Sequence, residues 1–386
     1  MKVLFVDDEP RVLEALERSL RIGGVAWEAR FVTSGELALE ALESSSFDVI
    51  VSDMRMPRMD GATLLAAVAE RDPSMVRIVL SGQAEEASAL RVVRVAHQFL
   101  SKPCDAKTLR QVVERTGALR RTLTNPSLRA TVGSVDRLPS AMHVFQRLSE
   151  LLAEDEVSTD AVTEVVRQDP AMASKLLQLA NSAFFARSRE VSDVRAAVLR
   201  LGTKTIKNLA LVIGVFDSCD PGAGSRLISV EQMQLRSFAT AKVAAGIAER
   251  GQADSAFMAG LVCDLGELVL ASKASEQLAV AWQAAAAQNL PRSHCEREVF
   301  GASHAEVGAY LLSLWGLPFA VVEAVALHHQ PLDGAQPGIG LPVLVWIASC
   351  SVAGEEPDAE LVQALGAGEL LERARQLARP ADTLST

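Results

Sequence analysis

Acidic residues stand directly after two strongly apolar runs of the sequence. Val3–Val6 is followed by Asp7 and Asp8, and Val49–Ser52 is followed by Asp53. A short apolar run that ends on a carboxylate is typical of a buried strand in an open α/β sheet, where ligands bind beyond the carboxyl ends of the strands. We therefore expect Asp7, Asp8 and Asp53 to meet at one edge of a sheet.

Two further strand-like runs present a hydroxyl and an ammonium group in the same way. Ser81 comes directly after Val76–Leu80, and Lys102 follows Gln98–Ser101. A single aspartate after a strand is explained by helix capping, because Asp is a common N-cap residue. Strand ends that carry acids, a hydroxyl and a lysine together favour one shared site over separate caps.

The elements that must position these groups alternate between strand and helix over residues 1–117. The expected strands are 3–6, 27–32, 49–53, 76–80 and 98–101. The expected helices are 10–20, 36–42, 61–70, 84–95 and 105–115. This alternation predicts an α/β domain with a five-stranded, doubly wound parallel sheet. His97, just before the last strand, is expected at the surface or at the edge of the sheet.

Residues 1–117 resemble the receiver domain of two-component response regulators, a flavodoxin-like fold. The motifs that carry the resemblance are Val6-Asp7-Asp8-Glu9, Asp53-Met54-Arg55-Met56-Pro57, Ser81-Gly82 and Phe99-Leu100-x-Lys102-Pro103, in this order. The resemblance implies that Asp53 is a nucleophile that accepts a phosphoryl group, and that a sensor histidine kinase is its partner. It also implies that Phe99 is an aromatic switch residue, although ordinary strand packing explains Phe99 equally well.

The same resemblance implies Mg²⁺ at the carboxyl edge of the sheet. Mg²⁺ is usually held by a few carboxylates together with phosphate oxygens. The implied ligands are Asp7, Asp8, Asp53 and the backbone carbonyl of Arg55. Lys102 would pair with the incoming phosphoryl group, and the Ser81 hydroxyl would hydrogen-bond it.

Beyond residue 117 the strand signal disappears. Residues 118–137, polar and interrupted by Pro126, are expected to form a linker. Amphipathic helices with apolar residues at three- and four-residue spacing are then expected at 140–152, 160–167, 170–179, 194–201, 203–215, 230–249, 253–271, 277–287, 304–314, 319–328 and 341–353. This pattern predicts an all-α domain over residues 138–354. The C-terminal tail, 355–386, is expected to add one more helix over 358–378.

The helical part resembles the HD-related output domain, HDOD. The motifs are Gln168-Asp169-Pro170, Leu176-Leu177-x-Leu179-Ala180-Asn181-Ser182-Ala183-Phe184, Ala197-x-x-Arg200-Leu201-Gly202, Gly260-Leu261-Val262-Cys263-Asp264-Leu265-Gly266, Phe300-Gly301-x-x-His304-x-x-x-Gly308, Trp315-Gly316-Leu317-Pro318 and His328-His329-x-Pro331. The resemblance implies an HD-like helical fold, related to metal-dependent phosphohydrolases that hold two metals, in which the metal site has generally been lost.

That relationship implies a degenerate HD site in this chain. Its residues are Arg236, Cys263, Asp264, His304, His328 and His329. Arg236 falls near the position of an early histidine and would repel a metal, and Cys263 takes the histidine's place in the His-Asp pair. We interpret the surviving groups as hydrogen-bonded polar residues of the core. The alternative is a mononuclear metal site formed by Cys263, Asp264, His304 and one of the two adjacent histidines.

Two functions of different classes follow. In the first, phosphorylation controls a non-catalytic helical domain that binds a downstream signalling protein, so that the chain is not an enzyme. In the second, the helical domain is a regulated metal-dependent phosphohydrolase of nucleotides or cyclic dinucleotides. The missing ligands favour the first function, and no cofactor is expected in the helical domain. A change in homodimerisation is one expected response to phosphorylation.

Composition limits the remaining function classes. A chain of 386 residues suits two or three domains, and its net charge of −10 argues against bulk binding of nucleic acids or anionic membranes. Its five cysteines form no C-x-x-C pair, which indicates reduced, cytoplasmic usage. The apolar window Leu341–Gly354 has 14 residues, fewer than the roughly 20 that a membrane-spanning helix needs. We therefore expect a cytoplasmic protein without a membrane segment.

Overall fold

The computed structural model describes the chain in two compact units. It describes residues 1–386 apart from 23, 26, 82–94, 103, 105, 136–137, 141, 154–156, 183–184, 186–189, 204, 207–216, 219–226, 332–338 and 380–386. The first unit comprises Met1–Asp136 with the short segments Gln178–Glu190 and Ser313–Gly316. The second unit comprises Arg137–Leu177, Val191–Leu312 and Leu317–Thr386.

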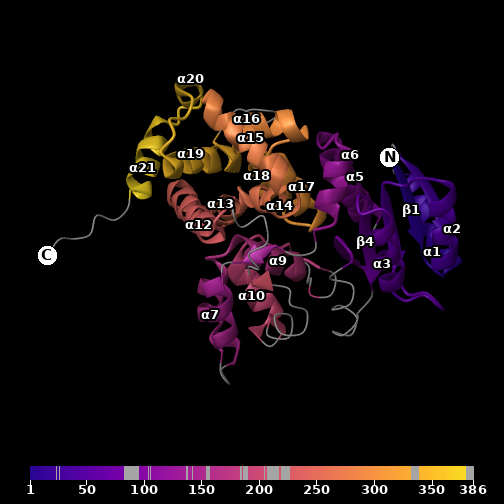
Figure 1. Cartoon of the computed structure of the whole chain (residues 1–386). Coiled ribbons are helices and arrows are strands. Elements are labelled where there is room, and N and C mark those ends of the chain that lie inside the picture. Colours follow the sequence, from indigo (N-terminus) through magenta and orange to yellow (C-terminus); the bar gives the residue numbers. More distant parts are fainter. Residues whose placement is uncertain are drawn as a thin grey trace. The chain divides into compact units, whose positions relative to one another are not determined.

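The first unit is built on a parallel five-stranded sheet, drawn in indigo and purple in Figure 1. Its strands are β1 (Lys2–Val6), β2 (Glu28–Val32), β3 (Val49–Asp53), β4 (Val76–Ser81) and β5 (Gln98–Ser101), in the order β2-β1-β3-β4-β5. Its helices include α1 (Pro10–Ile22), α2 (Gly35–Ser44), α3 (Gly61–Arg71) and α5 (Ala106–Thr122). This strand order confirms the predicted doubly wound, flavodoxin-like α/β fold. The helix expected over 84–95 lies almost entirely outside the described residues.

Burial explains why the central strands are continuous apolar runs. All five residues of β3 are buried, and so are the last four of β1, because helices cover both faces of a parallel sheet. The first three residues of the edge strand β2 are exposed. Register pairs Val6 with Ser52 and Val51 with Ile78, so the strands end side by side. The carboxyl ends of β1, β3 and β4 therefore form one edge.

The turn from β3 into α3 depends on close backbone contact. The side chain of Asp60 caps α3 by accepting a hydrogen bond from the Thr63 N–H at 2.8 Å. A Cβ atom on Gly61 would overlap the carbonyl oxygen of Asp53. Glycine is therefore required here for α3 to start directly against the end of β3.

The expected linker is partly helical and is packed within the first unit. Helix α6 (Pro126–Gly133) begins at the N-cap Asn125. Arg77 of β4, only 4% exposed, donates hydrogen bonds to the carbonyls of Pro73, Met75, Val95 and Gly133. The His97 ring also contacts the Gly133 carbonyl, at 3.0 Å, and accepts a hydrogen bond from the Arg77 backbone N–H at 3.1 Å. Of the two positions expected for His97, the surface position is wrong, because the residue is 4% exposed. The position at the edge of the sheet agrees with the structure, because His97 directly precedes the edge strand β5 and joins it to α6.

We predict that removing this contact destabilises the first unit. Arg77→Met removes a donor from four buried or part-buried carbonyls, which should lower the free energy of unfolding by about 2–4 kcal/mol. The matched control is Arg71→Met, because the exposed Arg71 donates to the single carbonyl of Leu42 and its loss should cost less than about 1 kcal/mol. Denaturant unfolding gives the energies, and hydrogen exchange of residues 126–133 localises the change. Equal effects of the two substitutions would contradict the assignment.

The second unit is almost entirely helical, as predicted. Its helices are α7 (Met142–Ala153), α8 (Thr159–Val166), α9 (Pro170–Ala180), α10 (Val194–Leu201), α12 (Val230–Ile247), α13 (Ala253–Val262), α14 (Leu265–Lys273), α15 (Ser275–Gln288), α16 (Arg292–Phe300), α17 (His304–Leu314), α18 (Phe319–Leu327), α19 (Leu341–Ala353), α20 (Ala359–Ala364) and α21 (Gly368–Ala378). The two-residue strands β6 (Pro139–Ser140) and β7 (Asp217–Ser218) pair in parallel.

Three details of the helical pattern differ from expectation. The helix expected over 253–271 is divided into α13 and α14. The single helix expected in the tail is two helices, α20 and α21, separated at Gly366, whose φ of 63° does not continue a right-handed helix. Helix α16 was not expected, because its charged sequence has no clear apolar periodicity. Most of the helix expected over 203–215 lies outside the described residues.

The core of the second unit is formed by α12 and α13 against α19 and α21, and Figure 1 shows these helices side by side. A Cβ atom on Gly260 would lie 3.0 Å from the Ala241 Cα atom, and one on Gly266 would overlap the His304 carbonyl. These glycines let α13 approach α12 and let α14 approach α17. Among the described residues, one stretch, Ala253–Lys273, is long and apolar enough to cross a membrane, yet 89% of its window is buried inside the fold.

Candidate functional site

Two aspartates and a lysine converge at the carboxyl edge of the sheet. The Lys102 Nζ atom lies 2.6 Å from Asp7 Oδ2 and 2.6 Å from Asp53 Oδ1. Both aspartates are buried, with 2% and 7% exposure. Three strands far apart in sequence, β1, β3 and β5, therefore deliver charged groups to one point, as the sequence predicted.

Backbone donors orient the two carboxylates. The second oxygen of Asp53, Oδ2, accepts a hydrogen bond from the Arg55 N–H at 3.0 Å. The second oxygen of Asp7, Oδ1, accepts one from the Glu9 N–H at 3.0 Å. Each aspartate thus has one oxygen held by the following loop and one oxygen facing Lys102.

The electrostatics of this edge suit a cation and an anion together. Burial raises the pKa of Asp53, while the hydrogen bond and charge of Lys102 oppose that rise. Burial lowers the pKa of Lys102, but hydrogen bonds to Asp53 and Asp7 outweigh it and raise the pKa overall. The half-buried Asp8 follows Asp7 directly in the chain, so three acids and one half-buried lysine lie at or next to this edge. A hard divalent cation with oxygen ligands fits this donor set.

For Ser81 and Phe99, the two other residues of the predicted site, the structure gives mainly their positions in the sheet. Ser81 is the last residue of β4 and stands opposite Ser101 in register, but its side chain lies outside the described part of the chain. Phe99 pairs with Val79 in the sheet and is 5% exposed, so its ring is packed inside. The strand register brings Ser81 to the same edge as Asp53, which pairs with Leu80.

A second charged cluster lies among α12, α14 and α18. The Arg236 Nε atom of α12 lies 3.0 Å from Asp264 Oδ2, and its Nη2 atom donates to Glu267 Oε2. Burial opposes ionisation of Asp264, but Arg236, His328 and His304 hold the pKa of this carboxyl well below its usual range. Burial and the charge of Asp264 raise the pKa of Glu267. Arg236 is therefore locked between two acids.

His304, the first residue of α17, is held by a buried glutamate. Its Nδ1 atom lies 2.6 Å from Glu296 Oε2, which also accepts the His304 backbone N–H at 2.8 Å. The Trp282 indole donates to the other oxygen, Oε1, at 2.9 Å. Burial opposes the charge on His304, but Glu296 raises the pKa of His304 to about 9. Burial likewise opposes the charge on Glu296, and His304 lowers the pKa of Glu296 to about 2.

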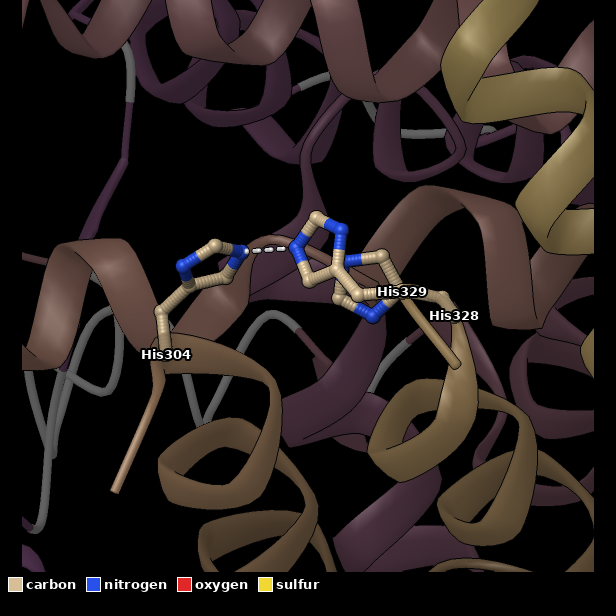
Figure 2. A group of neighbouring side chains, drawn as sticks. All are labelled: His304, His328 and His329. Atoms are coloured by element: carbon tan, nitrogen blue, oxygen red, sulfur yellow. Dashed lines mark hydrogen bonds between the residues drawn. The ribbon is translucent and has the colours of Figure 1, made fainter. Parts of the chain in front are cut away.

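Three histidines meet in one cluster (Figure 2), and two of them, His304 and His328, lie within 4 Å of Asp264. The Nε2 atoms of His304 and His329 are 2.9 Å apart, and the rings point toward one another. His328, at the end of α18, bonds the Val325 carbonyl through Nδ1 at 2.7 Å and places Nε2 3.5 Å from Asp264 Oδ1. The structure thus brings the predicted histidines and Asp264 into one cluster.

Cys263 lies beside this cluster but is engaged elsewhere. Its thiol donates to the Gly260 carbonyl at 3.3 Å. Burial raises the pKa of the Cys263 thiol well above its usual range, and the Asp264 charge adds to the effect. Because metals bind the thiolate, these surroundings disfavour Cys263 as a ligand.

Comparison with known proteins places both halves of the chain. A family model described as the HDOD domain matches residues 138–331, about half of the chain, and one described as the response regulator receiver domain matches residues 3–114. The chain belongs to the HDOD family. It joins a receiver domain to an HD-related output domain, as the two sequence resemblances predicted.

Individual relatives are more distant. Over 272 residues the chain is 27% identical to an uncharacterized protein of Treponema pallidum, covering 67% of this chain and 51% of that protein. It is 35% identical over 115 residues to the response regulator protein FleR of Pseudomonas aeruginosa, covering 30% of this chain and 24% of FleR. The chain thus spans about half, or less, of the length of these curated relatives.

Two solved structures share the fold. A crystal structure titled as the MmoQ response regulator from Methylococcus capsulatus has a TM-score of 0.50 and 22% identity, and covers 63% of this chain and 98% of its own. A virulence factor from Campylobacter jejuni has a TM-score of 0.50 and 18% identity, and covers 66% of this chain and 98% of its own. At these identities the likeness establishes fold alone.

Sequence reasoning missed three residues of the HDOD cluster, Glu267, Glu296 and Trp282. Glu267 lies three residues after Asp264, which is the spacing that puts two side chains on one helix face, so it could have been found. No sequence pattern indicates that Glu296 of α16 contacts His304, or that Trp282 of α15 contacts Glu296.

We predict a pH-dependent stability of the HDOD domain from the His304–Glu296 pair. A histidine whose pKa rises from 6.5 to about 9 on folding adds stability that is complete below pH 6.5 and is lost as the pH rises through 9. The contribution amounts to at most about 3 kcal/mol. In chelator-treated protein, the free energy of unfolding should therefore fall between pH 6.5 and 9, and Glu296→Gln should flatten that profile. Parallel profiles for wild type and variant would contradict the pairing.

Proposed function

We propose that the chain is a phosphorylation-controlled response regulator in which Asp53 accepts a phosphoryl group and a non-catalytic HDOD domain serves as an adaptor. The observation that carries the proposal is the Lys102 ammonium between Asp7 and Asp53, 2.6 Å from each. In this proposal residues 1–117 form the receiver, 118–137 the linker, 138–354 the output domain and 355–386 a helical tail.

The residues at the sheet edge support each part of a phosphoryl transfer. A carboxylate oxygen of Asp53 forms the new bond to phosphorus while the bond from phosphorus to the donor breaks. Lys102 transfers its contact from the carboxylates to the phosphoryl oxygens, and the Ser81 hydroxyl hydrogen-bonds another of them. Mg²⁺, held by Asp7, Asp8, Asp53 and the Arg55 carbonyl, would neutralise charge on the transferred group.

The partners of the receiver follow from this chemistry. Receiver domains take their phosphoryl group from a sensor histidine kinase, and the receiver match supports such a partner here. The added charge of about −1.5 to −2 would draw Ser81 toward the phosphate and shift the strand that carries Phe99. We expect the output to be contact with a downstream signalling protein through the HDOD domain or a change in dimerisation. The net charge of −10 argues against binding to nucleic acids or anionic membranes. We further propose a cytoplasmic location, on the scattered cysteines.

We predict that phosphorylation adds one phosphate at Asp53. Incubation with Mg²⁺ and a small acyl phosphate should raise the intact mass of wild-type protein by one phosphoryl group, and Asp53→Asn should remain unmodified. Asp60→Asn is the matched control, because Asp60 caps α3 and asparagine caps helices equally well. Equal labelling of the Asp53→Asn protein would refute the assignment.

The geometry of the HDOD cluster supports a non-catalytic output. Two-metal hydrolases hold ions about 3.5–4 Å apart, bridged by shared ligands. Here Asp264 Oδ2 is engaged by the Arg236 guanidinium at 3.0 Å, and Glu267 is bound by the same side chain. Arginine stays protonated in proteins, so this fixed positive charge competes with a second metal ion.

The competing function is a regulated metal-dependent phosphohydrolase, which the histidine cluster next to Asp264 favours. We predict no turnover of cyclic dinucleotides or nucleoside phosphates when Mn²⁺, Fe²⁺ or Zn²⁺ is added, in either the phosphorylated or the unphosphorylated protein. Product formation is followed by chromatography. Metal-dependent hydrolysis that disappears in Asp264→Ala would overturn the adaptor proposal.

A further inference from the structure

The histidine cluster of the HDOD domain has the chemistry of a metal site with three imidazole ligands. One ring nitrogen from each of His304, His328 and His329 lies within 4.8 Å of the others. His304 and His328 are 3% and 0% exposed, whereas His329 is exposed. Imidazole groups gathered at this spacing suit zinc and similar divalent transition metals.

In His304 and His328, hydrogen bonds at Nδ1 already orient the rings for metal binding through Nε2. The Nδ1 atom of His304 donates to the Glu296 carboxylate at 2.6 Å, and the Nδ1 atom of His328 donates to the Val325 carbonyl at 2.7 Å. With Nδ1 engaged in this way, Nε2 is the nitrogen of each ring that is left to bind a metal, and in His304 the metal takes the place of the Nε2 proton of the imidazolium. Metal-binding histidines are commonly oriented by such carboxylate and carbonyl acceptors.

One nitrogen of the cluster lacks a partner. The buried Nε2 atom of His328 has no hydrogen-bond partner among the described residues, although it lies 3.5 Å from Asp264 Oδ1. A buried polar atom without a hydrogen bond is costly and rare in native structures. A ligand that fills this cluster would remove the deficit.

The distances match one tetrahedral ion. Zinc bonds of about 2.0–2.1 Å in tetrahedral geometry place neighbouring ligand atoms about 3.3 Å apart. Here His304 Nε2 lies 2.9 Å from His329 Nε2 and 3.8 Å from Asp264 Oδ1, and His328 Nε2 lies 3.5 Å from that same oxygen. Shifts of a few tenths of an ångström bring these edges to the tetrahedral value.

We propose that the HDOD domain binds a single zinc-class divalent ion through His304, His328 and His329, with Asp264 as the fourth ligand. Arg236 takes the other oxygen of Asp264, which limits the site to one ion. The proposed ligand set differs from the one considered from sequence. The Cys263 thiol donates a hydrogen bond to the Gly260 carbonyl, so the third histidine takes the place of Cys263 as a ligand. This proposal does not depend on the function proposed above.

The ion has a route to the site from solvent. His329 lines a surface groove of about 600 Å³ together with Pro291, His294, Arg297 and Gln330. His329 also contacts the buried His304, Nε2 to Nε2 at 2.9 Å, so this exposed histidine links the groove to the cluster. A metal can therefore reach the cluster at His329, where it would replace the hydrogen bond between His304 and His329.

The test uses the full chain without a histidine tag. Chelator-treated protein is dialysed against Zn²⁺, its metal content is measured by mass spectrometry, and its affinity is measured by competition with a chromophoric chelator. We expect one zinc ion per chain for wild type and at least tenfold weaker binding for His329→Ala. The matched control is His294→Ala, whose exposed histidine lines the same groove but pairs with Glu298, and it should bind like wild type.

Two further measurements keep the proposal falsifiable. Glu296→Gln should weaken zinc binding about 10–100-fold, because the carboxylate that accepts the hydrogen bond of a ligating histidine raises the metal affinity of that histidine. Co²⁺-loaded wild type should show the intense visible bands of a tetrahedral site. Wild-type protein that retains no stoichiometric metal, or a His329→Ala protein with wild-type affinity, overturns the proposal. Zinc binding without hydrolysis leaves the adaptor function intact, and hydrolysis would refute that function without removing the metal site.

Discussion

Lys102 places one ammonium group between two buried carboxylates, 2.6 Å from Asp7 and 2.6 Å from Asp53, and the receiver depends on this pairing. Two buried acids without a cation would repel each other and take up protons. A protonated Asp53 would be a poor nucleophile, and burial already pushes its pKa upward. Lysine carries its charge on a flexible stem, so it can stabilise the ionised acids and then follow the charge to a phosphoryl group.

In the HDOD domain, an arginine rather than a lysine compensates the charge of two neighbouring buried acids. Arg236 bridges Asp264 and Glu267 through separate nitrogens of its planar guanidinium. A guanidinium stays charged and is held here by two acids, so it is less free to move to a new partner than the single ammonium of a lysine. Removing one partner of such a buried pair leaves an uncompensated charge, which is strongly destabilising. This arrangement fixes one side of the cluster through two ion pairs, while the three histidines gather on the other side of Asp264.

Helix α6 is attached to the sheet at the starts of β4 and β5. Strands β4 and β5 end at the edge that holds Ser81 and Lys102, and their starts are tied to α6 by Arg77 and His97. The helix therefore belongs physically to the receiver unit rather than to a free linker. A shift of these two strands would act on the contact with Gly133 at their opposite ends. Packed strands move as units because their hydrogen-bonded registers do not stretch.

The sequence by itself determined the fold of both units and the charged residues that meet at the carboxyl edge of the sheet. Apolar runs followed by charged residues specify buried parallel strands, and parallel strands necessarily bring their carboxyl ends together. Helical periodicity specified the second unit, except where a charged helix such as α16 has no periodic apolar face. Only the tertiary structure decided the burial of His97 and the pairing of His304 with Glu296. It also decided the meeting of three histidines beside Asp264. These contacts join residues on separate helices and loops, and their partners are chosen by packing in three dimensions, which leaves no periodic trace in the chain.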